Sequence, residues 1–193
     1  MRYVAGLAAL VCLSQSVSAE PFHHSSGEWR EYHRDWLAAC PAAIDEDGPD
    51  FYSFSCFAST GSQAQNSAAL PAYKLTLILN RLDGALDIAI TVAADDAIYD
   101  EARPMVLKLS GEPPISLAMR TDIETRYNTI NQYFVVDAEL RARLVDLMKD
   151  RAALTLAVPL EGRPAPVETR LSLQGVMAAL DFMTTNSRRV AQY

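Results

Sequence analysis

The residues best suited to metal chemistry in this sequence are its three histidines, His23, His24 and His33. Imidazole nitrogen is a common ligand of transition metals, so three rings close together in the chain are a candidate metal site. A working site also needs carboxylates or carbonyls that orient its histidines, and no such set can be recognised around these positions. We therefore predict a solvated segment here and no metal ligand.

A cluster of acidic residues, Asp45–Asp50, has the composition of a calcium-binding loop. Aligning Gly48 with the invariant glycine of an EF-hand places Ala43 at the first ligand position and Phe54 at the last. Neither side chain can bind a cation, so the alignment fails. We predict a charged turn at this position, with a looser cation site as the alternative.

The sequence carries no recognisable nucleophile for hydrolysis. The Gly-x-Ser-x-Gly elbow of α/β-hydrolases is absent, and a Ser-His-Asp triad would have to recruit a histidine from the N-terminal segment. A pair of carboxylates that cleaves glycosidic bonds remains an open alternative, because Asp and Glu are scattered along most of the chain. We predict that the protein is not an enzyme and has no catalytic or cofactor-binding residues. The alternative is a small secreted hydrolase whose acidic residues the sequence does not identify.

The first 19 residues have the three parts of a secretory signal peptide. Arg2 supplies a positive charge, Val4–Leu13 is a largely apolar run too short to span a bilayer, and Val17–Ala19 form the cleavage site. Val11 stands where a lipoprotein signal has a small residue before its cysteine. We predict cleavage of residues 1–19, no lipid anchor, and a periplasmic or secreted mature chain without a transmembrane segment.

Two cysteines, Cys40 and Cys56, remain once the signal peptide is removed. A chain exported to an oxidising compartment pairs such cysteines, and a bridge over this loop length stabilises a fold by roughly 3 kcal/mol in the chain-entropy model. Two cysteines alone cannot form a tetrahedral zinc site. We therefore predict a structural Cys40–Cys56 disulfide, with Trp36, Phe54 and Phe57 available to bury it.

The net charge of −7 is that of an acidic, soluble chain. Nucleic acids and anionic membrane surfaces attract basic patches, and this sequence has no block of Lys and Arg. The length that remains after cleavage is typical of a single domain. We therefore expect no nucleic acid as a partner, and instead an unidentified protein or other component of the cell envelope.

The stretch Tyr73–Val92 is the clearest structural element. Apolar residues alternate with polar or small ones on both sides of a turn at Asp83-Gly84, as in two half-buried strands, and the glycine accommodates a positive φ in the turn. A second layer must cover the apolar face. That face carries Tyr73, Leu75, Leu77, Leu79, Leu86, Ile88, Ile90 and Val92.

The remaining strands surround this hairpin in the sequence. Residues 20–28 are polar and contain Ser and Gly, which predicts a flexible leader before a single domain at 29–193. Alternating or aromatic-rich segments predict further strands at 35–40, 51–60, 105–109, 115–119, 132–136, 153–160 and 167–173. The last two are expected to pair in a hairpin.

Two helices are expected late in the chain. Asp137 is a suitable N-cap for an amphipathic helix with Leu140, Leu144, Leu147 and Met148 on one face. A final helix at 175–187 is expected to pack on the sheet through Val176, Ala179, Leu180 and Met183. Together these elements predict a mostly β fold, an antiparallel β-sandwich with one or two helices in the C-terminal half.

Several features occur in a distinctive order: Trp36 with Cys40 four residues later, the second cysteine Cys56, the long hairpin, the amphipathic helix, and the closing Arg170–Leu180 with its Ser-Leu-x-Gly-x-x-x-Ala-Leu pattern. This order resembles the invasion-associated locus B family of bacterial secreted proteins. Members often carry a further cysteine pair before the amphipathic helix, and Arg126–Phe134 has none.

The resemblance implies a β-sandwich protein of the periplasm or outer surface, linked in some pathogens to host-cell invasion, with no known cofactor or catalytic residues. The resulting prediction is a non-catalytic secreted envelope protein of the binding or interaction type. Its expected role lies in host-cell association or envelope homeostasis.

Overall fold

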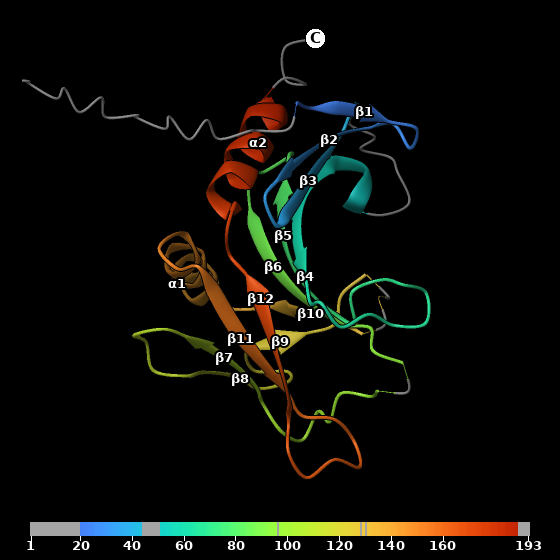
Figure 1. The fold of residues 1–193 in the computed structure, drawn as a ribbon. Helices are drawn as coiled ribbons and strands as arrows, with labels where there is room; N and C mark the ends of the chain where they lie inside the picture. Colours follow the sequence, from blue (N-terminus) through green and yellow to red (C-terminus); the bar gives the residue numbers. More distant parts are fainter. Residues whose placement is uncertain (1–19, 44–50, 96, 128, 130, 189–193) are drawn as a thin grey trace, which may run out of the picture.

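The structure is a computed structural model and describes residues 20–43, 51–95, 97–127, 129 and 131–188. The signal peptide predicted at 1–19 and the acidic turn predicted at Asp45–Asp50 lie outside these residues. The described chain is mostly antiparallel β, arranged in two sheets with two α-helices (Figure 1). The predicted fold class is therefore confirmed.

The larger sheet has eight strands, and Figure 1 shows its central strands strongly curved. A short 3-10 helix, η1 (Phe51–Phe54), leads into one of them. Every strand pairs with its neighbours in antiparallel fashion. In spatial order the strands are β1 (Phe22–His24), β2 (Glu28–His33), β3 (Trp36–Pro41), β4 (Ser55–Gly61), β5 (Tyr73–Asn80), β6 (Leu86–Val92), β10 (Gln132–Val135) and β9 (Ile123–Glu124).

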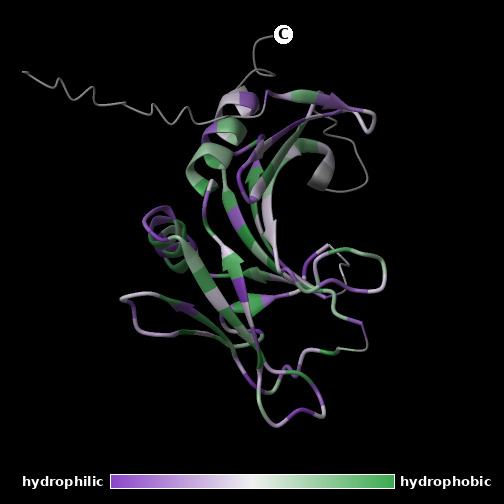
Figure 2. Cartoon of the chain, viewed as in Figure 1, coloured by the Kyte–Doolittle hydropathy of each residue, from purple (hydrophilic) through white to green (hydrophobic). Residues whose placement is uncertain are grey.

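The predicted central hairpin is confirmed as strands β5 and β6. Their register places Leu75 opposite Ile90 and Leu77 opposite Ile88, so the apolar residues share one face. Gly84 takes a φ of 76° in the turn, a conformation that glycine adopts without steric strain. Figure 2 shows hydrophobic and hydrophilic residues alternating along these strands. Ile78 and Ala89 are also buried, on the opposite face, in a smaller cluster with Phe134.

The smaller sheet and the helices supply the second layer. The sheet contains β12 (Val167–Ser172), β11 (Ala153–Val158), β7 (Met105–Leu109) and β8 (Ile115–Leu117) in spatial order. The predicted β11–β12 hairpin is confirmed, with Leu154 opposite Leu171. One continuous core between the layers joins residues of both sheets and both helices, among them Trp36, Leu77, Ile88, Leu156, Leu144 and Met183.

Helix α1 (Ala138–Lys149) begins as predicted. The backbone N–H of Leu140 donates to Oδ1 of Asp137 at 2.6 Å, which satisfies one of the free N–H groups at the helix N-terminus. Leu144 and Met148 enter the core. The opposite side of the helix is polar, as expected for an amphipathic helix at a surface.

Helix α2 (Val176–Arg188) packs against β2, β3 and β4. Val176, Ala179 and Met183 are buried as predicted. Leu180 packs against the core but is only partly buried, whereas Phe182, which the helical spacing did not single out, is 6% exposed. The buried face is therefore rotated slightly from the expected one, because β2 extends under Phe182.

The expected start of structure near Trp29 is wrong. Residues 20–28 were predicted as a leader, yet Phe22–His24 form strand β1 and pair with β2. Aromatic contacts hold this edge: the rings of Phe22 and Tyr32 stack at 6.2 Å, and His23 meets Trp29 edge-on at 5.2 Å. The composition of residues 20–28 predicted a polar segment. It could not reveal strand β1, because the aromatic rings that pair with Phe22 and His23 lie on another strand, β2.

Candidate binding site

The predicted disulfide is present. Strand register places Leu37 opposite Ser59 and Ala39 opposite Phe57, so Cys40 and Cys56 stand directly across from each other on β3 and β4. Their sulfurs are bonded and their Cα atoms lie 4.2 Å apart. Both residues are buried in the main core, which is typical of a structural bridge.

The aromatic surroundings of the bridge differ from the prediction. Trp36 shares the main core with both cysteines, but Phe54 and Phe57 belong to a separate cluster with Phe134. Phe57 follows Cys56 directly in a strand, and successive side chains of a strand point to opposite faces. Phe54 precedes the strand in η1, where the alternation of the strand does not apply.

The three histidines do not converge. His23 and His24 lie on edge strand β1, whereas His33 is buried on β2, with its Nδ1 3.6 Å from Oε1 of Glu31 and its ring 5.9 Å from that of Phe182. No group of three or more His, Cys, Asp or Glu residues suited to a metal occurs in the described part of the chain.

The outer face of the eight-stranded sheet, opposite the core, carries the candidate binding site. A hollow of about 500 Å³ lies on this face, and we refer to it as the outer-face hollow. Its floor comes from β3, β4, β5 and β6, and its sides come from the β2–β3 turn and from the loop 62–72. The main lining residues are Tyr32, Leu37, Leu70, Pro71, Lys74 and Thr91.

Lys74 is the charged group on the floor of this hollow. It lies near the start of β5 on the face opposite the core, and it is partly buried. Burial lowers the pKa of its ammonium group from the ordinary value of 10.5, because a charge is poorly solvated there. The ammonium group of Lys74 forms no ion pair or hydrogen bond with another described residue.

Two threonine hydroxyls accompany this ammonium group on the outer face. Thr91 lies directly opposite Lys74 in the β5–β6 ladder and lines the hollow. Thr76 follows two residues after Lys74 on the same face. The Oγ1 atoms of both threonines are buried and have no hydrogen-bond partner among the described residues. Buried polar atoms of this kind usually have a partner, and of the two threonines Thr91 is the one that lines the hollow.

The loop 62–72 is held in place by its own polar contacts. Asn66 Oδ1 accepts hydrogen bonds from the backbone N–H groups of Ala68 and Leu70, both at 3.1 Å, and its Nδ2 donates to the carbonyl of Ala93. Pro71 packs so closely on Gly61 that an added Cβ would lie 2.5 Å away. Leu70 is consequently fixed at the rim although it is 60% exposed.

A second, more polar hollow of about 500 Å³ adjoins the first and shares Asp35, Thr60 and Gly61 with it. At their common rim the Ser172 hydroxyl donates to Asp35 Oδ2 at 2.5 Å, and Trp36 Nε1 donates to the Ser172 carbonyl at 3.1 Å. These contacts fix the β2–β3 turn against the end of β12. The charged side chain of Asp35 is therefore engaged by the protein itself.

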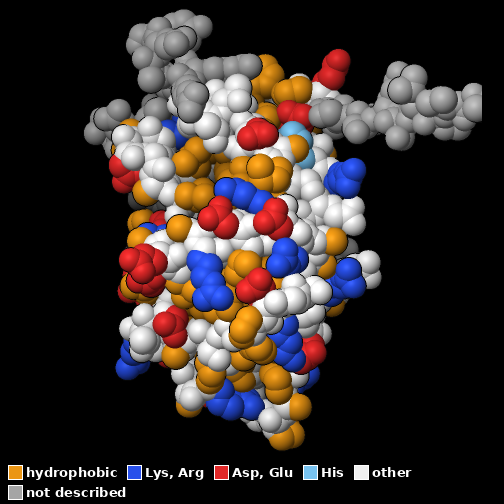
Figure 3. All heavy atoms as spheres, turned by 90° about the vertical axis from the view of Figure 1, so that its left-hand side faces the viewer, with side chains coloured by type: hydrophobic (Ala, Val, Ile, Leu, Met, Phe, Trp, Pro, Cys, Tyr) orange, Lys and Arg blue, Asp and Glu red, His pale blue; other side chains and the backbone are white. Residues whose placement is uncertain are grey.

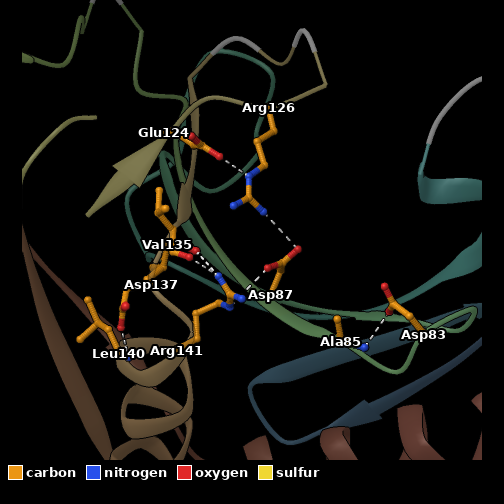
Figure 4. A network of polar contacts seen from close by, with 10 residues as sticks. Asp83, Ala85, Asp87, Glu124, Arg126, Val135, Asp137, Leu140 and Arg141 are labelled. Carbon is orange, nitrogen blue, oxygen red and sulfur yellow. Dashed lines mark hydrogen bonds and ion pairs between the residues drawn. The ribbon is translucent and has the colours of Figure 1, made fainter. Parts of the chain in front are cut away.

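The densest polar network has a structural role (Figure 4). Asp87 lies 3.4 Å from Arg126 and 3.4 Å from Arg141, and Arg126 also binds Glu124 at 2.6 Å. The pKa of Arg126 is raised: burial alone would lower it, but the hydrogen bond that Arg126 donates to Glu124 and the carboxylate charges of Asp87 and Glu124 outweigh burial. Each of these groups is partnered, so the network joins β6, β9 and α1 and offers no free charge to a ligand.

The face that carries α1 shows positive and negative side chains interspersed (Figure 3). Arg151 and Arg143 both approach Glu112, and Lys149 pairs with Asp146. Such a mixed surface provides no field of one sign that would attract a polyanion. No helix of the described chain is both long and apolar enough to cross a membrane.

The protein thus belongs to the mostly β structural class. It has two antiparallel sheets, a disulfide across β3 and β4, and two helices late in the chain. No family model matches the sequence, and no curated protein matches it. The crystal structure of invasion associated protein B from Bartonella henselae superposes with a TM-score of 0.52 and 17% sequence identity, over 82% of this chain and 98% of that chain. At this identity the similarity is one of fold, and it supports a structural relationship to that protein.

Proposed function

We propose that the protein is a non-catalytic binding protein of the periplasm or cell exterior, and that the outer-face hollow is its binding site. The observation that carries the proposal is the Lys74 ammonium group, which faces a largely apolar hollow without an ion pair to the described residues. A ligand that supplies the missing partner is the simplest explanation for a charge in that position.

Three observations support a location outside the cytoplasm. The Cys40–Cys56 disulfide is typical of proteins from oxidising compartments. The pattern of residues 1–19 is that of a signal peptide. The fold is similar to that of a protein named for its association with invasion. By this analogy we propose a role for the chain in host-cell association or in maintenance of the envelope.

Native mass spectrometry of protein purified from its own periplasm tests the proposal. We expect a mature chain that begins at Glu20, carries no lipid, and retains a bound molecule. Lys74→Glu should release that molecule, whereas Lys149→Glu, on α1, should retain it. Lys149 pairs with Asp146 away from the hollow, which makes it a matched control. A bound molecule retained by Lys74→Glu would contradict the assignment of the site, and a chain confined to the cytoplasm would contradict the location.

A small hydrolase is the second candidate, and one observation favours it. Glu31 and His33 lie side by side on β2 and line a hollow of about 350 Å³ with Asp181 of α2. Nε2 of His33 is buried and has no hydrogen-bond partner among the described residues. A carboxylate beside an imidazole is the arrangement of a general base that activates water.

Assays against ester and glycoside substrates separate the two candidates. A hydrolase would show turnover that His33→Ala and Glu31→Gln both abolish, while Lys74→Glu leaves it intact. A binding protein shows no turnover with any of these chains. We propose the binding function because the Glu31–His33 pair lies under Phe182 of α2, where the ring restricts access to the imidazole.

A further inference from the structure

We infer that the outer-face hollow binds a small amphiphile with a carboxylate at one end and an aliphatic chain at the other, as in a fatty acid of medium length. This inference rests on the proposed binding function and names its ligand class. The position of Lys74 among apolar side chains and the hydroxyl groups beside it carry the argument.

The charges around the hollow favour an anion. Besides Lys74, the ionisable side chains that line it are Tyr32, Arg34 and Asp35 of β2 and the β2–β3 turn. Arg34 and Asp35 are exposed at the rim, opposite in sign, and bound to Gln174 and Ser172 respectively. Lys74 on the floor is the charge that these contacts leave without a counter-ion. A carboxylate is complementary to it.

The hydroxyl groups give that carboxylate a second partner. Thr91 faces Lys74 across the ladder, and its Oγ1 has no hydrogen-bond partner among the described residues. A threonine hydroxyl can donate to a carboxylate oxygen while the ammonium group binds the other oxygen. Lys74 and Thr91 together therefore form a compact site for one carboxylate.

The apolar lining accommodates a chain. Leu37 lies on the floor, while Leu70 and Pro71 stand on one side and Tyr32 on the other. A volume of about 500 Å³ is within the range of pockets for small molecules. An extended peptide fits less well, because its backbone N–H and C=O groups would face these apolar side chains without partners. The observations thus favour a small amphiphile over a peptide.

Calorimetric titration of the mature protein with three probes tests this inference. Decanoate has both parts of the ligand, 1-decanol has the chain without the charge, and propionate has the charge with a short chain. We expect decanoate to bind at least tenfold more tightly than either of the others. Tighter binding of 1-decanol than of decanoate would overturn the assignment of an anionic ligand.

Variants locate the binding in the hollow. Lys74→Met should weaken decanoate binding at least tenfold and leave 1-decanol binding unchanged, because only the charge is removed. Leu70→Asp should weaken both, and Lys149→Met should change neither. The melting temperature of each variant confirms that it is folded. Equal decanoate affinities for the native chain and Lys74→Met would overturn the inference.

These experiments also separate a failure of the proposed ligand class from a failure of the proposed binding function. If decanoate does not bind, yet protein from its own periplasm carries a molecule that Lys74→Glu releases, the ligand class is wrong and the binding function stands. If neither occurs, both are wrong.

Discussion

Gly175 lies directly against the backbone carbonyl of His33: a Cβ atom added at Gly175 would lie 1.8 Å from that oxygen. Its φ of 101° is also a conformation that residues with side chains rarely adopt. This contact sets the end of β12 and the start of α2 against the β2–β3 turn. The same junction contains the hydrogen bond from Trp36 to the Ser172 carbonyl. Trp36 of the Trp-x-x-x-Cys pattern and Ser172 of the Ser-Leu-x-Gly pattern therefore touch in the folded protein.

Gly175→Ala should lower the free energy of unfolding by more than the roughly 1–3 kcal/mol that an unfavourable φ alone costs, because the new methyl group also displaces β2. Gly162→Ala is the matched control. Gly162 has a φ of 70° but nothing within 4 Å of an added Cβ, so only the backbone strain applies. Urea unfolding of both variants gives the comparison, and equal losses would contradict the close packing at Gly175.

The disulfide should contribute substantially to stability. Cys40→Ala and Cys56→Ala should each lower the free energy of unfolding by about 2–5 kcal/mol, and the double variant by little more, because all three remove the same bond. Thiol labelling of the unfolded, unreduced protein checks the bond itself. Two reactive thiols per mature chain would show that the bridge does not form in the native protein.

Alkaline pH should destabilise the protein through Tyr99. Its hydroxyl donates to the Arg103 carbonyl at 2.9 Å, and burial raises its pKa to about 12. The unfolded chain releases this proton near pH 10, so the contribution is fully present below that pH and is lost as the pH rises to about 12. The loss approaches about 2–3 kcal/mol.

Urea unfolding at several pH values above 9 measures this loss. Tyr99→Phe should be less stable than the native chain at pH 9 and should lose less stability as the pH rises. Tyr32→Phe, on a side chain that is 53% exposed, removes the same oxygen from the surface and provides the control. If the stability of Tyr99→Phe fell with pH as steeply as that of the native chain, Tyr99 would be excluded as the titrating group.

The charge network at Asp87 should contribute more than a surface ion pair. Asp87→Asn keeps the shape of the side chain but leaves Arg126 and Arg141 facing a neutral amide, and we expect a loss of about 1–2 kcal/mol. Glu168→Gln breaks the pair with Lys108, whose side chains are about half-exposed, and should change stability by less than about 1 kcal/mol. The prediction fails if both substitutions have the same effect on urea unfolding.

Local patterns predicted most of the framework. Alternation along Tyr73–Val92 defined the hairpin and its buried face, Asp137 marked the start of α1, and the count of cysteines identified the pair Cys40 and Cys56. The hairpin and the helix start depend on residues close in sequence. The cysteine pair follows because only two cysteines remain after the predicted signal peptide is removed. Strand β1 was missed because the aromatic partners that hold it, Trp29 and Tyr32, lie on β2.

The outer-face hollow was not predictable in this way. Its residues come from the β2–β3 region, β4, the loop 62–72, β5 and β6. The register of the sheet brings Thr91 beside Lys74, and the contacts of Asn66 and Pro71 hold Leu70 at the rim. The sequence contains one indication of the hollow. Lys74, flanked by Tyr73 and Leu75, points to the face of a long apolar strand opposite the core. Whether that face is exposed to solvent depends on the segments that pack beside it, and the periodicity of one strand does not predict how they pack.

Nuclear magnetic resonance of the protein labelled at lysine Cε tests the central claim most directly. The chain has three lysines, Lys74, Lys108 and Lys149, so each signal can be assigned by a single substitution. We predict that Lys74 titrates with a pKa below 10.5 in the free protein and that decanoate raises this pKa, since a bound carboxylate favours the charged ammonium. A Lys74 pKa of 10.5 or above in the free protein, or one that decanoate leaves unchanged, would contradict the assignment of Lys74 as a partly buried cation that binds an anionic ligand.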